Sequence, residues 1–289
     1  MRNPGGTYVN PATLDAGSGA DVSGRFLFSP AHELASSSVG APAPPLIADS
    51  WLVSDGAVRG LELHEARFRE SCTRLLPKLE SQVLERFFCD VRHSLPREGR
   101  WFPRIEAQAG PKPQLALWLR AAPELAEMTR LWVPSEPDAR RQPLVKGPDL
   151  PALALLREKA SLAGADDALL SAPDGTVLEA AHSAIVWWRG EILCVPEAED
   201  AILPSVTRAL LLGIAGREGI EVREERVSIA ELQDLETWTL NALHGIRPVS
   251  AWVTAGLEHI PPVDSARAHE LSLALDSLAV SIDDPTPAL

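Results

Sequence analysis

Cysteine is scarce in this chain: 3 of the 289 residues, Cys72, Cys89 and Cys194, with no CxxC pair. An odd and widely spaced set is typical of a reducing compartment and does not indicate a zinc site. No apolar run approaches the roughly 18 residues that a membrane span requires. The first residues lack the charged-then-apolar order of a signal peptide. We therefore expect a cytoplasmic protein with no membrane partner.

Basic residues are outnumbered by acidic ones, 27 to 40, which gives a formal net charge of -13. This balance argues against a nucleic-acid partner, because binding to phosphates needs a basic face, and it does not identify a substrate. Lysine is especially rare, since only Lys78, Lys112, Lys146 and Lys159 accompany 23 arginines. Tyr8 is the only tyrosine. If the chemistry needs a lysine, the candidates are few.

The remaining composition, 45% hydrophobic and 23% charged, is ordinary for a soluble globular protein. Residues 1–45 are rich in Gly, Ser, Ala and Pro and are predicted to form a flexible segment. Residues 46–122 predict a small α+β domain, and residues 128–289 predict a larger α+β domain. Helical spacing of apolar residues predicts helices within 61–80, 81–95, 151–164, 204–219 and 265–280. The predicted fold class is therefore α+β.

One carboxylate in the second half needs a partner. The stretch DGTVLEAAHSAIVWW (174–188) predicts a turn at its Asp-Gly, followed by two runs of strand-forming residues. Glu179 lies within these runs, and no lysine or arginine occurs within five positions of it. Burial of an unpaired carboxylate is strongly unfavourable. Glu179 therefore requires a cation from elsewhere, unless it lies on a half-exposed edge strand.

Three further features of the second half could share one ligand with Glu179. Lys146 lies in an apolar-flanked segment just before a helix, and the sequence 204–207 (PSVT) begins another helix, whose free N–H groups favour an anion such as phosphate. Asn241 lies where a strand passes into a loop. A lysine for a Schiff base, a buried acid and a phosphate-binding helix start together suit pyridoxal phosphate (PLP). Taken singly, each feature is also explained by a surface lysine, an edge carboxylate or a plain helix cap.

Four segments and one spacing occur together in an order that is found in a known family. The segments are LELHEARFRESC (61–72), GADDALLSAPDGTVLEAAHSAI (164–185), ILPSVTRALLL (202–212) and TLNALHGIRPV (239–249), and the spacing is the 33 residues from Lys146 to Glu179. With these features the chain resembles, from about Ala48 onward, the class IV aminotransferase family. Its members include branched-chain and D-amino-acid aminotransferases and aminodeoxychorismate lyase.

The resemblance implies a role for each matching residue. Lys146 is implied to form the Schiff base with PLP and to move the substrate proton, whereas the family has no role for Lys159. Glu179 is implied to face the protonated ring nitrogen, which would make the cofactor the cation that Glu179 requires. Arg104 resembles an arginine that binds the substrate carboxylate in some members. The residues implied to line the cofactor phosphate are Arg67, Ser205, Val206, Thr207, Asn241 and Ala242.

The implied architecture is the two-domain fold type IV of PLP enzymes similar to D-amino-acid aminotransferase, with the cofactor in a cleft between the domains of a homodimer subunit. The implied function is transamination between an amino acid or related primary amine and a keto acid. The alternatives are a lyase that releases pyruvate, a non-catalytic PLP- or metabolite-binding homologue, and a cofactor-free α+β binding module.

Some positions depart from the family pattern. Ser205 stands where the family usually has glycine, and Ala184 stands where it usually has asparagine. These departures indicate a retained cofactor set and a remodelled substrate side. His64, His182 and His244 lack acidic neighbours at ligand spacing, so no metal site is predicted.

Overall fold

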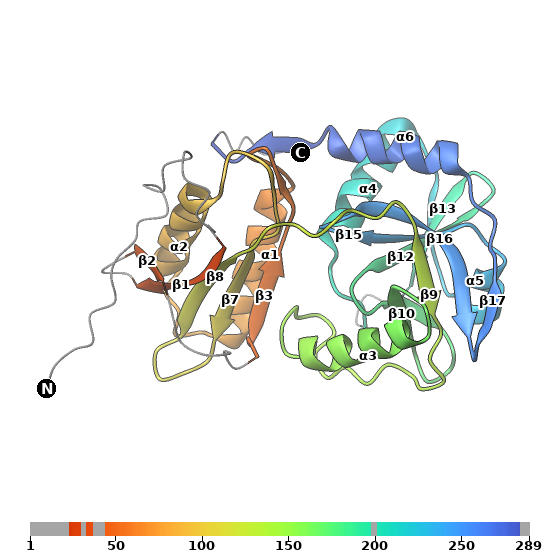
Figure 1. Ribbon diagram of the computed structural model, residues 1–289, viewed down its shortest axis with the longest axis horizontal. Coiled ribbons are helices and arrows are strands. Elements are labelled where there is room, and N and C mark those ends of the chain that lie inside the picture. Colours follow the sequence, from red (N-terminus) through yellow and green to blue (C-terminus); the bar gives the residue numbers. More distant parts are fainter. Residues whose placement is uncertain (1–22, 30–32, 37–43, 198–200, 284–289) are drawn as a thin grey trace, which may run out of the picture. The chain divides into compact units, whose positions relative to one another are not determined.

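The computed structural model describes residues 23–29, 33–36, 44–197 and 201–283, and the chain forms two compact units (Figure 1). Unit 1 comprises Met1–Pro123 together with Ala279–Leu289, and unit 2 comprises Glu124–Leu278. Each unit combines helices with β-sheet, which confirms the predicted α+β class. Among the described residues, no helix has both the length and the apolar content that a bilayer crossing demands.

Unit 1 is built on a five-stranded antiparallel sheet against which two helices pack. The strands, in spatial order, are β2 (Glu33–Ser36), β1 (Gly24–Ser29), β8 (Gln114–Leu119), β7 (Arg104–Gln108) and β3 (Ile47–Ser50). The helices are α1 (Leu61–Leu75) and α2 (Ser81–Ser94). Phe28 of β1 meets Phe87 of α2 edge-to-face, with ring centroids 5.4 Å apart. Aromatic packing therefore joins this part of the sheet to its helices.

A second, four-stranded sheet of unit 1 combines segments from both ends of the sequence. Its order is β18 (Ala279–Ser281), β5 (Ala57–Arg59), β4 (Val53–Ser54) and β6 (Arg100–Trp101). The sequence predicts a helix up to residue 280, but α6 (Ser265–Asp276) ends earlier, and Val280 pairs with Val58 instead. Backbone pairing with a distant strand is decided by tertiary contacts, which helical spacing cannot indicate.

The segment predicted to be flexible, 1–45, contains two strands, β1 and β2, in its described part. Residues 1–22, 30–32 and 37–43 lie outside the described residues. Strand β1 pairs with β8 and buries Phe26 and Phe28. The Gly, Ser, Ala and Pro content of the whole segment conceals this short apolar run, which needs β8 as its partner.

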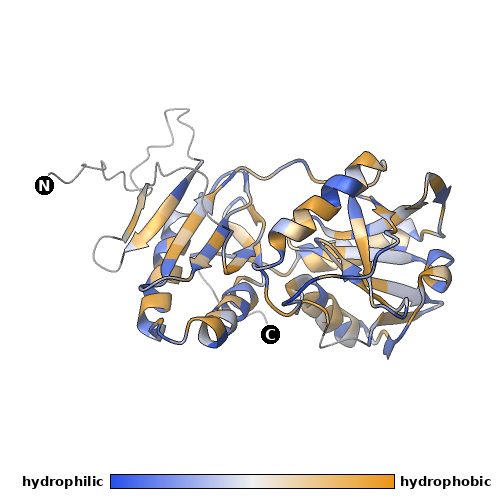
Figure 2. Ribbon diagram, turned by 90° about the horizontal axis from the view of Figure 1, so that it is seen from below, coloured by the Kyte–Doolittle hydropathy of each residue, from blue (hydrophilic) through white to orange (hydrophobic). Residues whose placement is uncertain are grey.

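Unit 2 is built on a nine-stranded sheet with parallel and antiparallel pairs. The main order is β11 (Val177–Ala180), β10 (Asp167–Ser171), β9 (Thr129–Trp132), β16 (Gly245–Thr254), β15 (Thr237–Asn241), β12 (Ala184–Arg189), β13 (Ile192–Pro196) and β14 (Val222–Glu225), and β17 (Leu257–His259) pairs with β16. The helices are α3 (Leu150–Leu162), α4 (Val206–Glu218), α5 (Ile229–Gln233) and α6. Figure 2 shows much of the apolar colour along the strands. Trp187, Trp238 and Trp252 are fully buried in this unit.

Candidate active site

Glu179 lies in unit 2 on β11, all four residues of which are buried, and Glu179 itself is 6% exposed. Its Oε1 accepts a hydrogen bond of 2.5 Å from Nη1 of Arg140 and one of 2.8 Å from the backbone N–H of Leu203. The sequence offers no lysine or arginine within five positions of Glu179, and the resemblance implies the cofactor as the cation that Glu179 faces. The structure adds a cation of the chain itself, because Arg140 reaches Glu179 from 39 residues earlier.

Arg140 lies in the connection between β9 and α3, and its side chain is 5% exposed. Besides Glu179, its guanidinium binds the Asp138 carboxylate, with 2.8 Å between Nη2 and Oδ2, and donates to the Ala201 carbonyl at 2.9 Å. We call Asp138, Arg140 and Glu179 the Arg140 cluster. Sequence reasoning missed Arg140, because nothing in its local sequence distinguishes it from the adjacent exposed Arg141.

The charges of the Arg140 cluster do not balance. Burial raises the pKa of Glu179, while Arg140, the Leu203 N–H and the charge of Arg208 act in the opposite direction. Burial also opposes the charge on Arg140, but its hydrogen bond to Asp138 and its attraction to Glu179 outweigh burial and raise its pKa. Two carboxylates therefore share one buried guanidinium. The three residues of the cluster carry one more negative than positive charge, and Arg208 adds a positive charge that acts on Glu179 from outside the cluster.

The start of α4 lies beside this cluster, since Leu203 precedes the helix and binds Glu179. Ser205 is the N-cap, and its Oγ accepts a hydrogen bond of 3.2 Å from the backbone N–H of Arg208. Val206 and Thr207 are buried in the first turn. First-turn N–H groups have no partner within a helix, and the helix dipole adds positive potential there. This helix start therefore suits an anionic group such as phosphate.

Lys146 is half-buried between the buried residues Val145 and Gly147, in the same connection as Arg140. The Asp149 carboxylate braces this connection, because it accepts a hydrogen bond of 2.9 Å from the backbone N–H of Gln142. Lys159, by contrast, is exposed on α3. Unit 2 thus holds Lys146, the Arg140 cluster and the start of α4.

Asn241 ends β15 and shapes the turn that contains Ala242. Its Oδ1 accepts from the backbone N–H groups of Leu243 (3.1 Å) and His244 (2.8 Å), and its Nδ2 donates to Ser183 Oγ at 3.0 Å. Each end of the Asn241 amide therefore has a protein partner. The turn also places Asn241 next to Ser183, the last residue of the path from β11 into β12.

Arg67 belongs to unit 1, on α1. Its Nε and Nη2 bind the two oxygens of Asp49, each at 2.8 Å, and His64 Nδ1 lies 2.8 Å from Asp49 Oδ1. We call Asp49, His64 and Arg67 the Asp49 cluster. Asp49 is fully buried, which by itself raises its pKa, but Arg67 and His64 outweigh burial and hold the pKa well below its usual range.

Arg104 also belongs to unit 1, on β7, where it forms an ion pair with the buried Glu106 at 2.9 Å between Nε and Oε1. Arg25 of β1 donates to the other oxygen of Glu106 at 3.3 Å. Burial lowers the pKa of Arg104, Arg25 lowers it further, and Glu106 opposes the change. Two arginines therefore share one carboxylate on this sheet.

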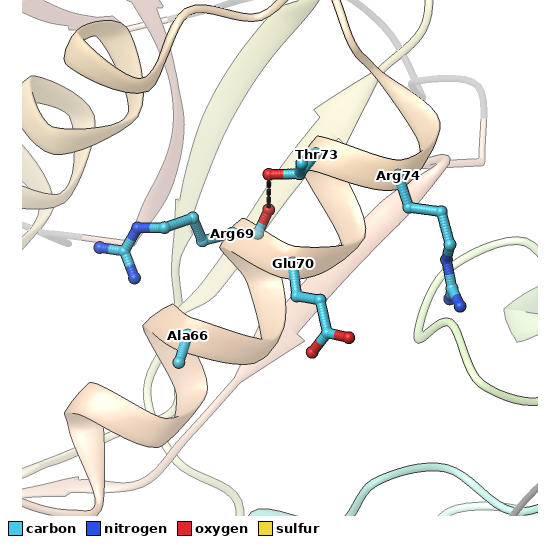
Figure 3. A pocket seen from close by; sticks show the side chains of 5 residues that line it. All are labelled: Ala66, Arg69, Glu70, Thr73 and Arg74. Atoms are coloured by element: carbon cyan, nitrogen blue, oxygen red, sulfur yellow. Dashed lines mark hydrogen bonds between the residues drawn. The ribbon is translucent and has the colours of Figure 1, made fainter.

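A further surface feature of the described part of unit 1 lies on α1. It is a hollow of about 390 Å³ lined by Ala66, Arg69, Glu70, Thr73 and Arg74 (Figure 3). None of these residues is among the predicted site residues. Within the described ranges, no three His, Cys, Asp or Glu side chains gather as metal ligands.

Comparison with known proteins identifies the family. The sequence model of the family described as "Amino-transferase class IV" matches residues 46–252, more than half of the chain. The chain belongs to this family. A Rickettsia bellii protein named "Probable branched-chain-amino-acid aminotransferase" is 33% identical over 78 residues, which is 27% of this chain and 27% of that relative. The match therefore spans about a quarter of the relative's length.

Two solved structures share the fold. A fold IV-transaminase from Curtobacterium pusillum has a TM-score of 0.69 at 18% identity and covers 87% of this chain and 96% of its own. A hypothetical aminotransferase from Mycobacterium tuberculosis, solved in a PLP-bound form, has a TM-score of 0.72 at 18% identity, with 89% and 99% covered. These likenesses confirm the predicted fold type IV.

Proposed function

We propose that this protein is a PLP-dependent class IV aminotransferase that acts on an amino acid or a related primary amine and a keto acid. The observation that carries the proposal is the Arg140 cluster. In it the buried carboxylate of Glu179 is held on one oxygen and lies beside the start of α4, in the same unit as Lys146. These residues fit PLP, whose ring nitrogen is cationic and whose phosphate is anionic. When bound, PLP supplies a ring that accepts electrons from the substrate Cα.

Each residue of unit 2 has a definite task in this proposal. Lys146 binds the cofactor covalently and, once released by the substrate, moves the Cα proton. Glu179 holds the proton on the ring nitrogen. The N–H groups of Val206 and Thr207 bind the phosphate at the start of α4, near the Ser205 cap.

The remaining predicted residues have supporting roles. Arg67 adds a positive charge for the phosphate, and Asn241 and Ala242 shape a turn that lines the phosphate side. Arg104 binds the substrate carboxylate. The enzyme is a cytoplasmic homodimer.

A lyase that releases pyruvate is a second candidate. The observation that favours it is the ion pair of Arg104 with Glu106, because an arginine that already has a carboxylate partner is a poorer site for the carboxylate of an amino acceptor. The two activities share the removal of the Cα proton by Lys146. They are separated by products: a lyase releases pyruvate from its amino substrate without an acceptor, whereas an aminotransferase needs a keto acid.

The test of the cofactor assignment is chemical labelling. Wild type, Lys146→Ala and Lys159→Ala are each incubated with PLP, reduced with borohydride and analysed by peptide mass spectrometry. We expect reduced PLP on the Lys146 peptide of wild type and of Lys159→Ala, and no label at that peptide in Lys146→Ala. A wild type that carries no label, or carries it on another lysine, contradicts the proposal. Separate, unreduced samples of PLP-loaded wild type are then supplied with amino acids and keto acids, and the products are identified.

A further inference from the structure

Arg140 connects three segments of unit 2 that carry site residues. Its guanidinium binds Glu179 on β11, Asp138 within its own connection, and the carbonyl of Ala201 before α4. The connection is also tied to β10, because the backbone N–H of Asp138 donates to the Ser171 carbonyl at 2.8 Å. Lys146 lies six residues after Arg140 in this connection. One side chain therefore holds the segments of the lysine, the acid and the helix start together.

The contacts on Glu179 are asymmetric. Both hydrogen bonds that reach its carboxylate within the described ranges, from Arg140 and from Leu203, end on Oε1. Two donors on one oxygen restrict rotation of the carboxylate. An ionised carboxylate accepts about four hydrogen bonds, so Oε2 retains its capacity to accept a proton donor of a ligand.

The charges that surround Glu179 determine whether it stays ionised. Arg140 and Arg208 favour the ionised form, and Asp138 shares the charge of Arg140. Burial alone raises the pKa of this carboxyl. Without Arg140 the pKa of Glu179 rises further, so that more of it is neutral at a given pH. A neutral carboxylic acid does not stabilise a protonated ring nitrogen.

We propose that Arg140 is a positioning residue for the cofactor: it holds Oε1 of an ionised Glu179, directs Oε2 to the ring nitrogen, and anchors the Lys146 segment to β11. This inference rests on the proposed function, since it assumes that PLP is the ligand. A guanidinium suits the task because its fork reaches two carboxylates and a carbonyl at once. A purely structural Arg140 would stabilise the fold without affecting the ring nitrogen.

The readout is the protonation of the ring nitrogen, measured by the NMR shift of PLP labelled with ¹⁵N. Wild type, Arg140→Gln, Arg140→Lys and the exposed neighbour Arg141→Gln are loaded with the labelled cofactor and titrated with alkali. We expect the wild type and Arg141→Gln to keep the proton to high pH. In Arg140→Gln the proton passes from the ring nitrogen to the now more basic Glu179, so the midpoint at which the nitrogen is seen to lose its proton falls by about one pH unit or more, a roughly tenfold change. Arg140→Lys retains the charge and gives an intermediate midpoint.

A cofactor analogue with carbon in place of the ring nitrogen tests whether Arg140 acts on cofactor binding through that nitrogen. Arg140→Gln is expected to weaken PLP binding about tenfold or more relative to wild type, as expected for the loss of a hydrogen bond to a charged group. The fold-change that Arg140→Gln causes in the binding affinity is expected to be much smaller for the analogue than for PLP. A folded Arg140→Gln with a wild-type midpoint, or an equal loss for PLP and the analogue, overturns the inference.

Two outcomes need separate interpretation. If Arg140→Gln does not fold, Arg140→Lys is used instead, because its cation beside both carboxylates should allow folding. A wild-type deprotonation midpoint of the ring nitrogen in Arg140→Lys then overturns the inference. A lowered midpoint supports it. If wild type carries no PLP on Lys146, the proposed function fails before Arg140 is tested. Folding is monitored by circular dichroism in every variant.

Discussion

The Asp49 cluster of unit 1 and the Arg140 cluster of unit 2 both join a buried carboxylate to an arginine, but their charge balance differs. Asp49 has an arginine on both oxygens and a histidine beside it, and its pKa is far below the usual range. Glu179 has both donors on one oxygen and shares its arginine with Asp138, and its pKa is raised. The first carboxylate is saturated by the protein, and the second is suited to a further cation.

The largest effect is expected from Asp49→Asn, which removes the charge that Arg67 and His64 both face. Loss of one partner from a buried ion pair costs about 3–5 kcal/mol, so we expect a loss of that order in the free energy of unfolding, measured with urea. The matched control is Glu85→Gln, since the Arg69–Glu85 pair is exposed and such pairs contribute about 0–1 kcal/mol. Equal losses of unfolding free energy in Asp49→Asn and Glu85→Gln would show that the buried ion pair of Asp49 stabilises the protein no more than the exposed pair does.

Glu179→Gln is expected to cost less, because burial already disfavours the charge that it removes. The amide keeps an oxygen for the Arg140 and Leu203 donors, and Arg140 keeps Asp138. We expect a loss of about 1–3 kcal/mol in the free energy of unfolding of the cofactor-free protein. If Glu179→Gln destabilises the protein as much as Asp49→Asn, the contrast between the clusters is incorrect.

The two clusters are expected to give opposite pH dependences of stability. Asp49 has a lowered pKa in the folded state, so its contribution is present above about pH 4 and is lost as the pH falls below the ordinary carboxyl pKa. Glu179 has a raised pKa in the folded state, so its charge opposes folding at neutral pH. This opposition is relieved as the pH falls through the folded pKa towards the ordinary glutamate value.

The measurement is urea unfolding of cofactor-free protein at a series of pH values. From neutral pH downward to about pH 5, wild type should gain stability relative to Glu179→Gln. Below about pH 4, wild type should lose stability relative to Asp49→Asn. Parallel stability curves for wild type and Glu179→Gln would mean that the pKa of Glu179 is not raised on folding.

The smallest effect concerns the cap of α4. Ser205→Ala removes the acceptor for the Arg208 N–H and should cost about 1 kcal/mol in the free energy of unfolding, whereas Ser205→Gly should cost only a few tenths. The control is Ser228→Ala in the capping box of α5. If Ser205→Gly costs more than Ser205→Ala, the side-chain oxygen is not the reason that serine is tolerated at this position.

Much of the local structure follows from sequence pattern. The spacing of apolar residues predicts α2 and α4 close to their observed limits and the start of α1, although α1 ends at Leu75 and not at 80. Strand β18 is not predictable in this way, because three residues next to a helix become a strand only by pairing with β5. Strand β1 likewise depends on β8.

The candidate site was likewise predictable only in part. The sequence alone indicated that Glu179 needs a cation if it is buried, that Ser205 begins a helix and that lysines are few, since charge, capping and composition are local properties. Only the tertiary structure decided that the cation within the chain is Arg140, 39 residues earlier, and that its charge is shared with Asp138. The partner of a buried charge is chosen by which segments the fold brings together. Spacing along the chain does not contain that information.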